Sequence, residues 1–413
     1  MEGRSVQVIL YENAGATAFG PLTLLRPVFD LRCGALLLRE KLEHRRPSWD
    51  VLLGARPALA EWAAETYPGR VPADAHDAPT LLLAANVVVD DVLLAALDDV
   101  DGETALTSGG TVIGARVDSR VQERIGAFED SGRDFSSLKL DDTLEVPARA
   151  VCFPWQLVHL NSEEIEHDAP YVPAPGEVEG AISEGAHVVE PARVSVGEGA
   201  SVAPGVVLDA SAGPVIVAPG ARIMANAVVL GPAFVGADTV IKVGARIYAG
   251  TSIGESCKVG GEVEGSIVHS YSNKQHDGFL GHSYLGSWVN LGAATDTSDL
   301  KNNYGTVRVE IDGEIHDTGS MFVGATIGDH TKTAIGTKLN TGVVIGVFAN
   351  VVASEVSPKV IPSFAWSVNG HVSVHAVEKA VATARLVMAR RTVELTQAGE
   401  DVIRRVFEVE LER

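Results

Sequence analysis

Hydrophobic residues recur at every sixth position through the middle of the chain. Between Ile216 and Gly260 aliphatic side chains keep this spacing, which neither a helix with a period of 3.6 nor a strand with a period of 2 produces. A triangular β-solenoid requires it, because each flat side takes six residues and one inward aliphatic side chain. The positions are Val217, Ile223, Val229, Val235, Ile241, Ile247, Ile253 and Val259.

The six-residue period extends in both directions from this core. Weaker copies precede it from Ile182 to Leu208, and it resumes at Phe279, Leu285 and Leu291 and again between Ile327 and Val351. We therefore predict one solenoid over residues 176–366. The segment between Leu291 and Met321 leaves the period, and Asp312-Gly313 within it indicates a hairpin closed by a type I′ turn, which a solenoid must loop outward.

Both ends of the chain have other patterns. Over residues 1–160, strand-like runs such as VQVILYE and TLLLAANVVV alternate with helical runs such as VFDLRCGALLLREKLE. This order indicates an α/β, Rossmann-like domain with a mostly parallel sheet, followed by a linker over residues 161–175. Residues 372–413 show helical spacing, and we expect Gly399 to separate two helices that cap the solenoid.

Composition narrows the function classes. The 413 residues suit two or three domains, and 33 basic against 54 acidic residues give a net charge of −21, which repels nucleic acid and anionic membranes. The three cysteines are isolated, so neither a disulfide framework nor a zinc site is indicated. Without a signal-peptide layout or a long apolar stretch, we expect a cytoplasmic protein with no nucleic-acid or membrane partner.

The front segment resembles a divergent branch of the sugar-phosphate nucleotidyltransferases, above all in LTLLRPVFDLRCG. Members of that wider family join a nucleoside triphosphate to a sugar 1-phosphate with Mg²⁺. The resemblance implies nucleotide binding at Arg26 and Asn86, and Mg²⁺ binding at Asp90 and Asp91 if this domain is active. The family's G-x-G-T-R loop is absent, and Asn86 stands where the family has a metal-binding Asp. A domain that only binds or stabilises is the alternative.

A segment of about twenty residues, NKQHDGFLGHSYLGSWVNLGAAT, resembles the GlmU family of N-acetylglucosamine-1-phosphate uridylyltransferases and glucosamine-1-phosphate acetyltransferases. The match needs no gap and places the family's catalytic histidine on His276. An imidazole, with a pKa of about 6.5, can accept the proton that an amine loses when it attacks a thioester. His282 could contact the substrate or lie on the surface, and we favour the surface.

The same resemblance implies the handedness of the solenoid, the other ligands and the assembly. It implies a left-handed β-helix that forms a homotrimer, with acetyl-CoA lying in a groove between neighbouring subunits. The implied substrate-binding residues are Arg246, Tyr248, Lys274 and Asn290, and the implied acetyl-CoA-binding residues are Asn303, Tyr304, Lys332 and Lys338. The family lysine in V-E-x-K has no counterpart, because Ser266 stands there.

We therefore expect acetyl transfer from acetyl-CoA to the amine of a hexosamine 1-phosphate, foremost glucosamine 1-phosphate, coupled to nucleotidyl transfer that gives a UDP- or dTDP-sugar. Two alternatives stay open. One is a sugar-1-phosphate nucleotidyltransferase whose β-helix only trimerises it. The other is a non-catalytic scaffold that binds sugar nucleotides.

Overall fold

The computed structural model describes residues 6–412, apart from the side chains of residues 14 and 17. Residues 1–5, where the sequence has no signal-peptide layout, and residue 413 lie outside this range. The chain divides into two compact units. The first comprises residues 1–19, 25–31 and 36–152, and the second comprises residues 20–24, 32–35 and 153–413. Each unit is described by itself.

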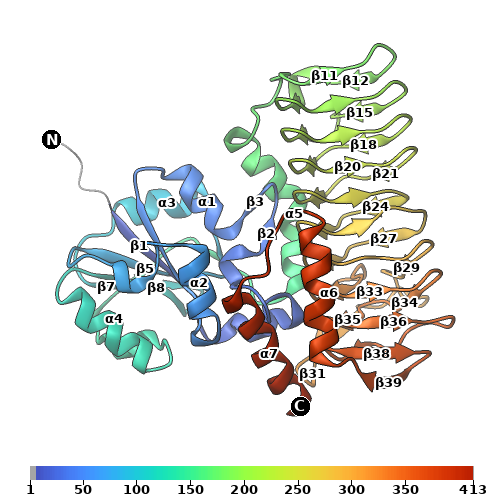
Figure 1. Ribbon diagram of the computed structural model, residues 1–413. Helices are drawn as coiled ribbons and strands as arrows, with labels where there is room; N and C mark the ends of the chain where they lie inside the picture. Colours follow the sequence, from blue (N-terminus) through green and yellow to red (C-terminus); the bar gives the residue numbers. More distant parts are fainter. Residues whose placement is uncertain (1–5, 413) are drawn as a thin grey trace. The chain divides into compact units, whose positions relative to one another are not determined.

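The first unit is an α/β domain built on one six-stranded sheet (Figure 1). Its central strands are buried and pair in parallel, as the aliphatic runs predict, whereas β8 runs antiparallel to both of its neighbours. The strand order is β4 (Asp50–Gly54), β1 (Gln7–Tyr11), β5 (Thr80–Ala84), β8 (Thr111–Val117), β7 (Thr104–Ser108) and β9 (Asp142–Glu145). The helices are α1 (Leu38–Arg45), α2 (Ala60–Thr66), α3 (Asp91–Asp98) and α4 (Val121–Asp130).

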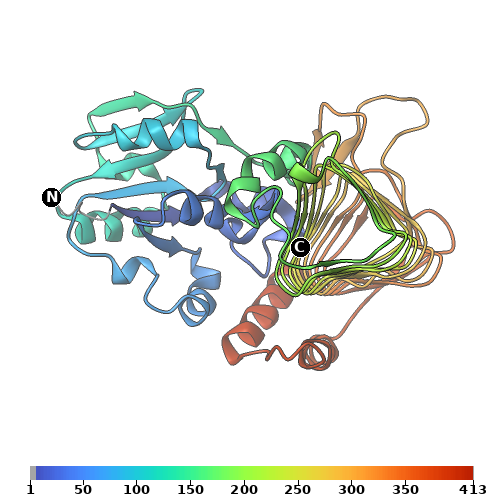
Figure 2. The same ribbon diagram turned by 90° about the horizontal axis from the view of Figure 1, so that it is seen from above.

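The second unit is a left-handed parallel β-helix with a triangular cross-section (Figure 2). Face 1 consists of β11 (Ala181–Ile182), β14 (Ser201–Val202), β17 (Arg222–Ile223), β20 (Val240–Ile241), β23 (Lys258–Val259) and β26 (Asn273–Lys274). Face 2 consists of β12 (His187–Val189), β15 (Val207–Asp209), β18 (Val228–Leu230), β21 (Arg246–Ile247), β24 (Glu262–Glu264) and β27 (Phe279–Gly281).

Face 3 is the longest sheet of the β-helix, with nine strands. They are β13 (Val194–Val196), β16 (Val215–Val217), β19 (Ala233–Val235), β22 (Thr251–Ile253), β25 (Ile267–Val268), β28 (Tyr284–Leu285), β32 (Thr326–Ile327), β35 (Val344–Ile345) and β37 (Val360–Ile361). Later coils continue the other faces with β29 (Asp296–Thr297) and β34 (Lys338–Leu339), and with β33 (Lys332–Thr333), β36 (Asn350–Val352) and β38 (Ala365–Val368). Strand β38 pairs antiparallel with β39 (His371–Val374).

The interior of the β-helix confirms the six-residue period, with one change of register. The eight aliphatic positions from Val217 to Val259 are at most 1% exposed. Phe279, predicted to point inward, is half-buried instead, and Leu280 takes the inward position opposite Val263. One coil is shortened there, so that Lys274 occupies the inward position opposite Val259.

The inserted hairpin has the predicted turn. Strands β30 (Arg308–Ile311) and β31 (Glu314–Asp317) pair antiparallel, and Asp312 and Gly313 have φ values of 51° and 80°. Positive φ at both central positions is the signature of a type I′ turn. Strand β30 packs back on the β-helix instead of looping freely outward, because Val307, Val309 and Ile311 share a buried cluster with Trp155, Val323 and Val344.

The expected linker and the expected break at Gly399 both differ from the structure. Residues 161–175 are not an open linker, because α5 (Pro154–Asp168) begins within the expected front domain and packs on face 3. At the C-terminus α6 (Val377–Ala389) and α7 (Gln397–Glu412) are separated by residues 390–396, and Gly399 lies in the first turn of α7. Across residues 6–412 no helix has both the length and the apolar character needed to cross a membrane.

A column of aromatic side chains at one corner accounts for the position of the C-terminal helix. Trp288, His330, Phe348 and Phe364 stack on successive coils, with His330 and Phe348 parallel at 4.6 Å between ring centroids. Phe407 of α7 packs edge-on against the last ring at 4.9 Å. The four corner residues adopt positive φ, and ring stacking offsets part of that backbone cost.

Candidate active site

His276 lies at the corner between face 1 and face 2, in the bend that joins β26 to β27. Its side chain is exposed, and no side chain in the described part of the chain hydrogen-bonds to the imidazole. Asp277, the neighbour that could have oriented the ring, is also exposed, and its carbonyl accepts a hydrogen bond from Ala294 N at 2.9 Å. The backbone of the next coil therefore fixes this bend, and the imidazole faces outward.

Glycines give the corner its tight path. Gly278 has a φ of 123°, and a Cβ atom on it would collide with the carbonyl oxygen of Thr295 on the next coil. Gly261, on the preceding coil, has a φ of 71°, and a Cβ atom there would lie 2.6 Å from the Lys274 ammonium nitrogen. Only residues without a side chain leave room for this bend and for the ammonium group.

Lys274 points into the β-helix rather than toward a substrate. It is 2% exposed, and its Nζ donates hydrogen bonds to the carbonyl oxygens of Gly260 at 3.0 Å and His276 at 3.1 Å. Burial lowers the pKa of this lysine to about 8, against the opposing pull of the Asp296 and Asp277 carboxylates. Lys274, predicted to bind the sugar phosphate, is thus buried and donates to two backbone carbonyls, and its substrate-binding role stays a prediction.

This pKa gives a testable pH dependence. An unfolded lysine has a pKa of about 10.4, so between about pH 8 and pH 10 the unfolded state binds more protons than the folded state, and stability rises with pH. Relative to Lys274→Met, the wild-type protein should gain stability from about pH 7.5 to about pH 9.5. Thermal unfolding midpoints of both proteins at the two pH values measure this, and a constant difference would contradict the burial of the charge.

Arg246 and Tyr248 lie on face 2, two coils before Phe279. The Arg246 side chain is 53% exposed and pairs with Glu262 at 3.1 Å. Slight burial and then the Glu262 carboxylate raise the pKa of the Tyr248 hydroxyl. Both predicted substrate residues therefore share one carboxylate neighbour, and a sugar phosphate must compete with Glu262 for the guanidinium.

Asn290 and Lys332 belong to an outward-facing column on face 1. Asn290 is exposed and bridges Asn273 on one side and Lys332 on the other. The Lys332 ammonium donates to the carbonyl oxygen of its near neighbour His330 at 2.9 Å, and burial lowers its pKa to about 8. One N–H group of Lys332, which was predicted to contact acetyl-CoA, thus donates to the backbone.

A pocket of about 720 Å³ opens on the coils that follow the His276 corner. Asp296, at its near end, accepts a hydrogen bond from Phe279 N at 2.7 Å and pairs with Lys338 in the ladder. Three lysines line the pocket, namely Lys301, Lys338 and Lys359, and the predicted Asn303 lies beside them. Tyr304 is 68% exposed and is not among the lining residues.

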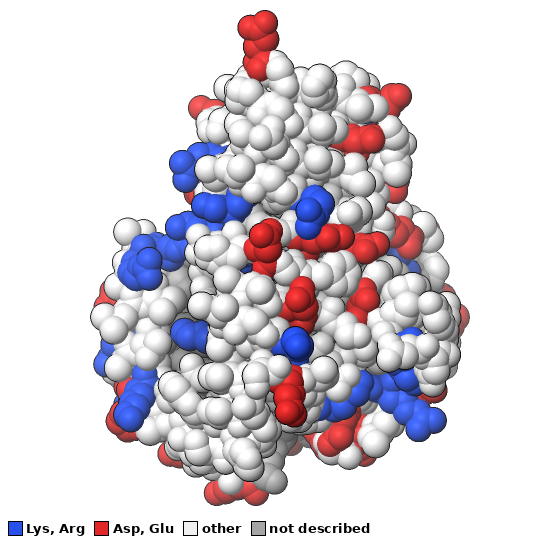
Figure 3. Space-filling model, turned by 90° about the vertical axis from the view of Figure 1, so that its right-hand side faces the viewer, with Lys and Arg blue, Asp and Glu red and all other residues white. Residues whose placement is uncertain are grey.

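These lysines matter because the chain as a whole carries a net charge of −21. The chain has ten lysines, and three of them meet at this pocket. On the side of the molecule that Figure 3 presents, acidic side chains run down the middle, and Lys and Arg gather to either side. The pocket is thus a local basic site that can attract an anion against the overall charge of the protein.

His282 is neither exposed nor equivalent to His276. Its Nδ1 lies 2.8 Å from Asp299 Oδ2, and its ring packs against Phe322 at 5.2 Å. Val323 N donates to Asp299 O at 2.9 Å, so this pair secures the returning end of the inserted segment. His282, which we expected to lie on the surface, is half-buried and has a carboxylate partner.

The residues predicted to bind Mg²⁺ in the first unit have other partners. Asp90 caps α3 by accepting from Leu93 N at 2.8 Å and also pairs with Arg149 at 3.3 Å. Asp91 is exposed, and Arg45 lies 3.8 Å away. Within residues 6–412 no group of three potential ligand side chains includes either carboxylate. Both carboxylates thus already face a cation or a backbone N–H group, and Mg²⁺ binding here stays a prediction.

Asn86 and Arg26, the predicted nucleotide-binding residues, are both buried. The Asn86 amide donates to Val151 O at 2.7 Å and accepts from Asn13 Nδ2 at 3.3 Å. Next to them at the carboxyl end of β1, the buried Glu12 carboxylate accepts from Val28 N at 2.9 Å and from Arg56 N and Nη1 at 2.7 Å. This edge of the sheet is rich in polar groups that already pair with one another.

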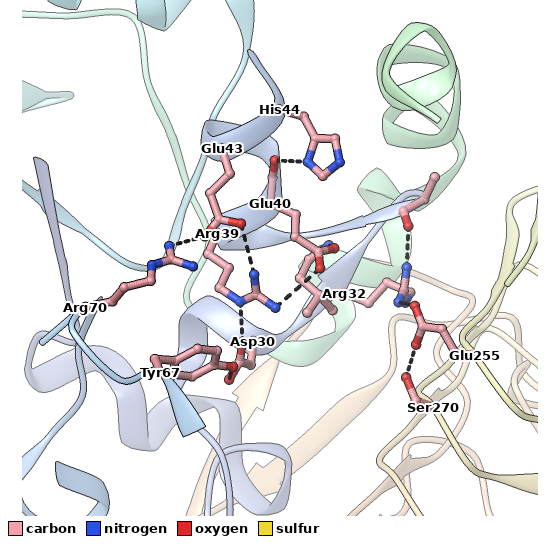
Figure 4. Close-up of polar contacts among 12 residues, drawn as sticks. Asp30, Arg32, Arg39, Glu40, Glu43, His44, Tyr67, Arg70, Glu255 and Ser270 are labelled. Carbon is pink, nitrogen blue, oxygen red and sulfur yellow. Dashed lines mark hydrogen bonds and ion pairs between the residues drawn. The ribbon is translucent and has the colours of Figure 1, made fainter. Parts of the chain in front are cut away.

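The LTLLRPVFDLRCG motif supplies two polar networks (Figure 4). In the first unit Asp30 accepts from Arg39 Nε at 2.8 Å and from the Tyr67 hydroxyl at 2.7 Å. In the second unit Arg32, 1% exposed, pairs with Glu255 at 2.6 Å. Burial opposes ionisation of Glu255, but Arg32 and the Ser270 hydroxyl outweigh it and lower the pKa to about 2. The motif therefore has a structural role in both units.

Comparison with known proteins agrees with both parts of this architecture. Residues 8–174 match the sugar nucleotidyl transferase family. The bifunctional protein GlmU of Ralstonia pickettii is 29% identical over 181 residues, 38% of this chain and 40% of that protein. The chain thus resembles the GlmU protein over about two fifths of its own length.

Two further comparisons extend this result. The GlmU of Bordetella parapertussis is 32% identical over 177 residues, which cover 40% of this chain and 37% of that protein. A bifunctional sugar-1-phosphate nucleotidylyltransferase/acetyltransferase of Sulfurisphaera tokodaii is 32% identical over 97 residues, or 23% of this chain and 24% of that protein. The chain thus spans two fifths or less of the length of these relatives.

Among solved structures, the UDP-N-acetylglucosamine acyltransferase of Francisella novicida covers 56% of this chain and 74% of its own, with 15% identity and a TM-score of 0.30.

The pattern of the sequence did not reveal every residue of the site. Lys301 and Lys359 were missed because each stands alone in an irregular stretch, and only folding brings them next to Lys338. The scarcity of lysine was the one available signal. Asp299 was missed for a similar reason, since it lies far from His282 in the sequence.

Proposed function

We propose that this protein transfers an acetyl group from acetyl-CoA to the amine of a hexosamine 1-phosphate, with glucosamine 1-phosphate as the first candidate. The amine nitrogen attacks the thioester carbonyl carbon, and the His276 imidazole accepts the proton that the amine loses as the C–N bond forms. The C–S bond then breaks, and the imidazolium returns the proton to the leaving thiolate. The observation that carries this proposal is the exposed imidazole of His276 at a glycine-built corner, with a lysine-lined pocket on the coils that follow.

The pocket suits the phosphate groups of coenzyme A. It lies on the coils that follow His276, and stacked coils rise by about 4.8 Å each, so its lysines stand on the order of 10–15 Å from the reacting centre. The long arm between the thioester and the phosphates of coenzyme A requires such a separation. We also propose that the active form is a homotrimer, in which a neighbouring subunit completes the groove; sedimentation analysis that found only monomers would contradict this.

One assay separates the proposed activity from its alternatives. Protein is incubated with acetyl-CoA and glucosamine 1-phosphate, and thiol release is measured; UTP or dTTP is then added, and pyrophosphate is measured. Thiol release dependent on the amino sugar supports acetyl transfer. Pyrophosphate without thiol favours a nucleotidyltransferase with a structural β-helix, and neither product favours a binding scaffold.

Nucleotidyl transfer is the second candidate function, because residues 8–174 match the sugar nucleotidyl transferase family. The paired carboxylates at Asp90 and Asp91 do not support the metal dependence that this chemistry implies. We therefore assign no step to this unit.

Lys359→Ala is expected to raise the KM for acetyl-CoA about five- to tenfold with little change in kcat. The reason is that a charge-assisted hydrogen bond to phosphate contributes about 1.5–3 kcal/mol, reduced at an exposed pocket by solvent screening. Initial rates at varied acetyl-CoA measure the effect. Lys379→Ala, an exposed lysine on α6 away from the pocket, is the matched control. An unchanged KM for acetyl-CoA in the Lys359 variant would contradict the proposal that this pocket binds the phosphates of coenzyme A.

A further inference from the structure

Lys274 breaks the pattern of the β-helix interior. The inward positions on face 1 run Val202, Ile223, Ile241 and Val259, and Lys274 comes next. Leu291 restores an aliphatic side chain one coil later and is 3% exposed. Between Val202 and Leu291, this column of the core therefore holds one cationic side chain among aliphatic ones.

Such a residue is unfavourable for stability alone. Moving an ammonium group out of water costs several kcal/mol even after the protein relaxes, and apolar residues of similar volume often replace buried charges without loss. The carboxylates that face this ammonium, Asp277, Asp296 and Glu262, only partly offset its burial, and Arg246 opposes them. A functional role therefore explains a lysine at this core position better than stability does.

The hydrogen bonds of Lys274 place its ammonium group at the corner that carries His276. The ammonium bridges two successive coils at one corner, because Gly260 and His276 supply the two carbonyl acceptors. Gly261 has no side chain to block it. The residue that carries the exposed imidazole is therefore held by its own backbone carbonyl, from inside the β-helix.

We propose that Lys274 is a positioning residue: from within the core its ammonium holds the backbone carbonyl of His276 and thereby fixes where the imidazole meets the amine. This inference rests on the proposed acetyl transfer. It replaces the expectation that Lys274 binds the sugar phosphate. The lysine touches neither substrate, and its effect on the reaction passes through His276.

The test compares Lys274→Met with the wild type in the full chain. Methionine keeps the length of the side chain and loses the donor, so the corner should loosen. Misplacing a catalytic group by about 1 Å can cost 10²-fold, and we expect kcat to fall about 10- to 100-fold while both KM values stay within about twofold. Leu291→Met, an aliphatic change one coil further along the same column, is the matched control and should leave kcat unchanged.

Two readouts distinguish positioning from general damage. In the wild type, kcat should decline above about pH 8, where the ammonium loses its charge, and this alkaline limb should be absent from Lys274→Met. Hydrogen exchange of the Ala294 and Glu262 amides, which donate to the carbonyl oxygens of Asp277 and Gly278 at this corner, should be faster in the variant than in the wild type. Exchange in the first unit should not change.

The opposite results would overturn the inference. An unchanged kcat in a folded Lys274→Met protein would show that the contact has no role in the reaction. A raised KM for the sugar phosphate with unchanged kcat would restore the phosphate-binding role. If Lys274→Met does not fold, Lys274→Gln, which keeps a neutral donor, is judged by its pH profile: loss of the alkaline limb supports the inference, and its persistence overturns it.

If the wild-type protein releases no thiol, the proposed function is refuted, but the structural role of Lys274 at the corner is not. Exchange of the Ala294 and Glu262 amides then decides whether Lys274 holds the corner, since this measurement needs no substrate. Exchange that is equally slow in both proteins would show that Lys274 does not hold the corner.

Discussion

Replacing His276 with alanine is expected to lower kcat for thiol release from acetyl-CoA by about 10²- to 10⁴-fold, the range that a positioned general base contributes. The physical reason is that the amine must lose a proton as the C–N bond forms, and water at neutral pH is a poor acceptor for it. KM values should change little, because the exposed imidazole would act mainly in the transition state. Thiol release at saturating substrates measures the effect.

A second histidine in the same segment offers the control. His282 faces Asp299 at the opposite end of face 2, so His282→Gln should leave kcat close to the wild-type value. Equal rates for wild type and His276→Ala would refute the assigned base. Loss of activity in both variants with retained folding would mean that the segment, and not one imidazole, is required.

Replacing Arg32 with methionine is expected to destabilise the second unit by about 3 kcal/mol, at the lower end of the range for breaking a buried ion pair. Arg32 is 1% exposed and Glu255 is 43% exposed, so water can partly solvate the carboxylate that remains. The guanidinium also donates to Ala35 O, and the backbone of Arg32 exchanges hydrogen bonds with the Tyr284 hydroxyl at 2.7 and 3.1 Å. Only the side-chain contacts are lost in this variant.

Urea unfolding followed by tryptophan fluorescence and circular dichroism measures this loss. Glu378→Gln, which breaks the exposed pair with Arg404, should have little effect and controls for charge removal. The depressed pKa of Glu255 adds a pH signature, since a carboxylate with a lowered folded-state pKa stabilises the protein at neutral pH. Between about pH 5 and pH 2 the wild type should lose its advantage over Arg32→Met, and a constant difference would contradict the pairing.

Much of the fold could be predicted because its determinants are local. The six-residue period specifies which side chain points inward on each flat side, and the Asp312-Gly313 pair permits the two positive φ values of the hairpin turn. The break at Gly399 was predicted wrongly, because glycine is tolerated in the first turn of a helix that packs through other residues. Propensity at one position decides little when neighbouring residues form the contacts.

The sequence indicated which segment carries the candidate site better than it indicated which side chains surround it. A motif of about twenty residues points to His276, whose role as the base stays a prediction. The inward orientation of Lys274 could not be predicted, because one coil is shorter than the six-residue period requires. A shift of one residue in a strand moves every side chain to the other face, and here it turned an expected surface cation into a core residue. Asp90, predicted to bind Mg²⁺, caps α3, a role that its position directly before the helix favours equally.

The sequence by itself determined the β-helix, the α/β front unit and the segment that carries His276, because each depends on periodicity or on short-range spacing. Only the tertiary structure decided what surrounds that histidine. The lysine pocket draws Lys301, Lys338 and Lys359 from separate coils and a loop, and the support beneath His276 depends on which way Lys274 points. Stacking of coils brings together residues that are distant in the chain. The six-residue period specifies the inward aliphatic positions, but it does not specify which polar side chains on stacked coils become neighbours.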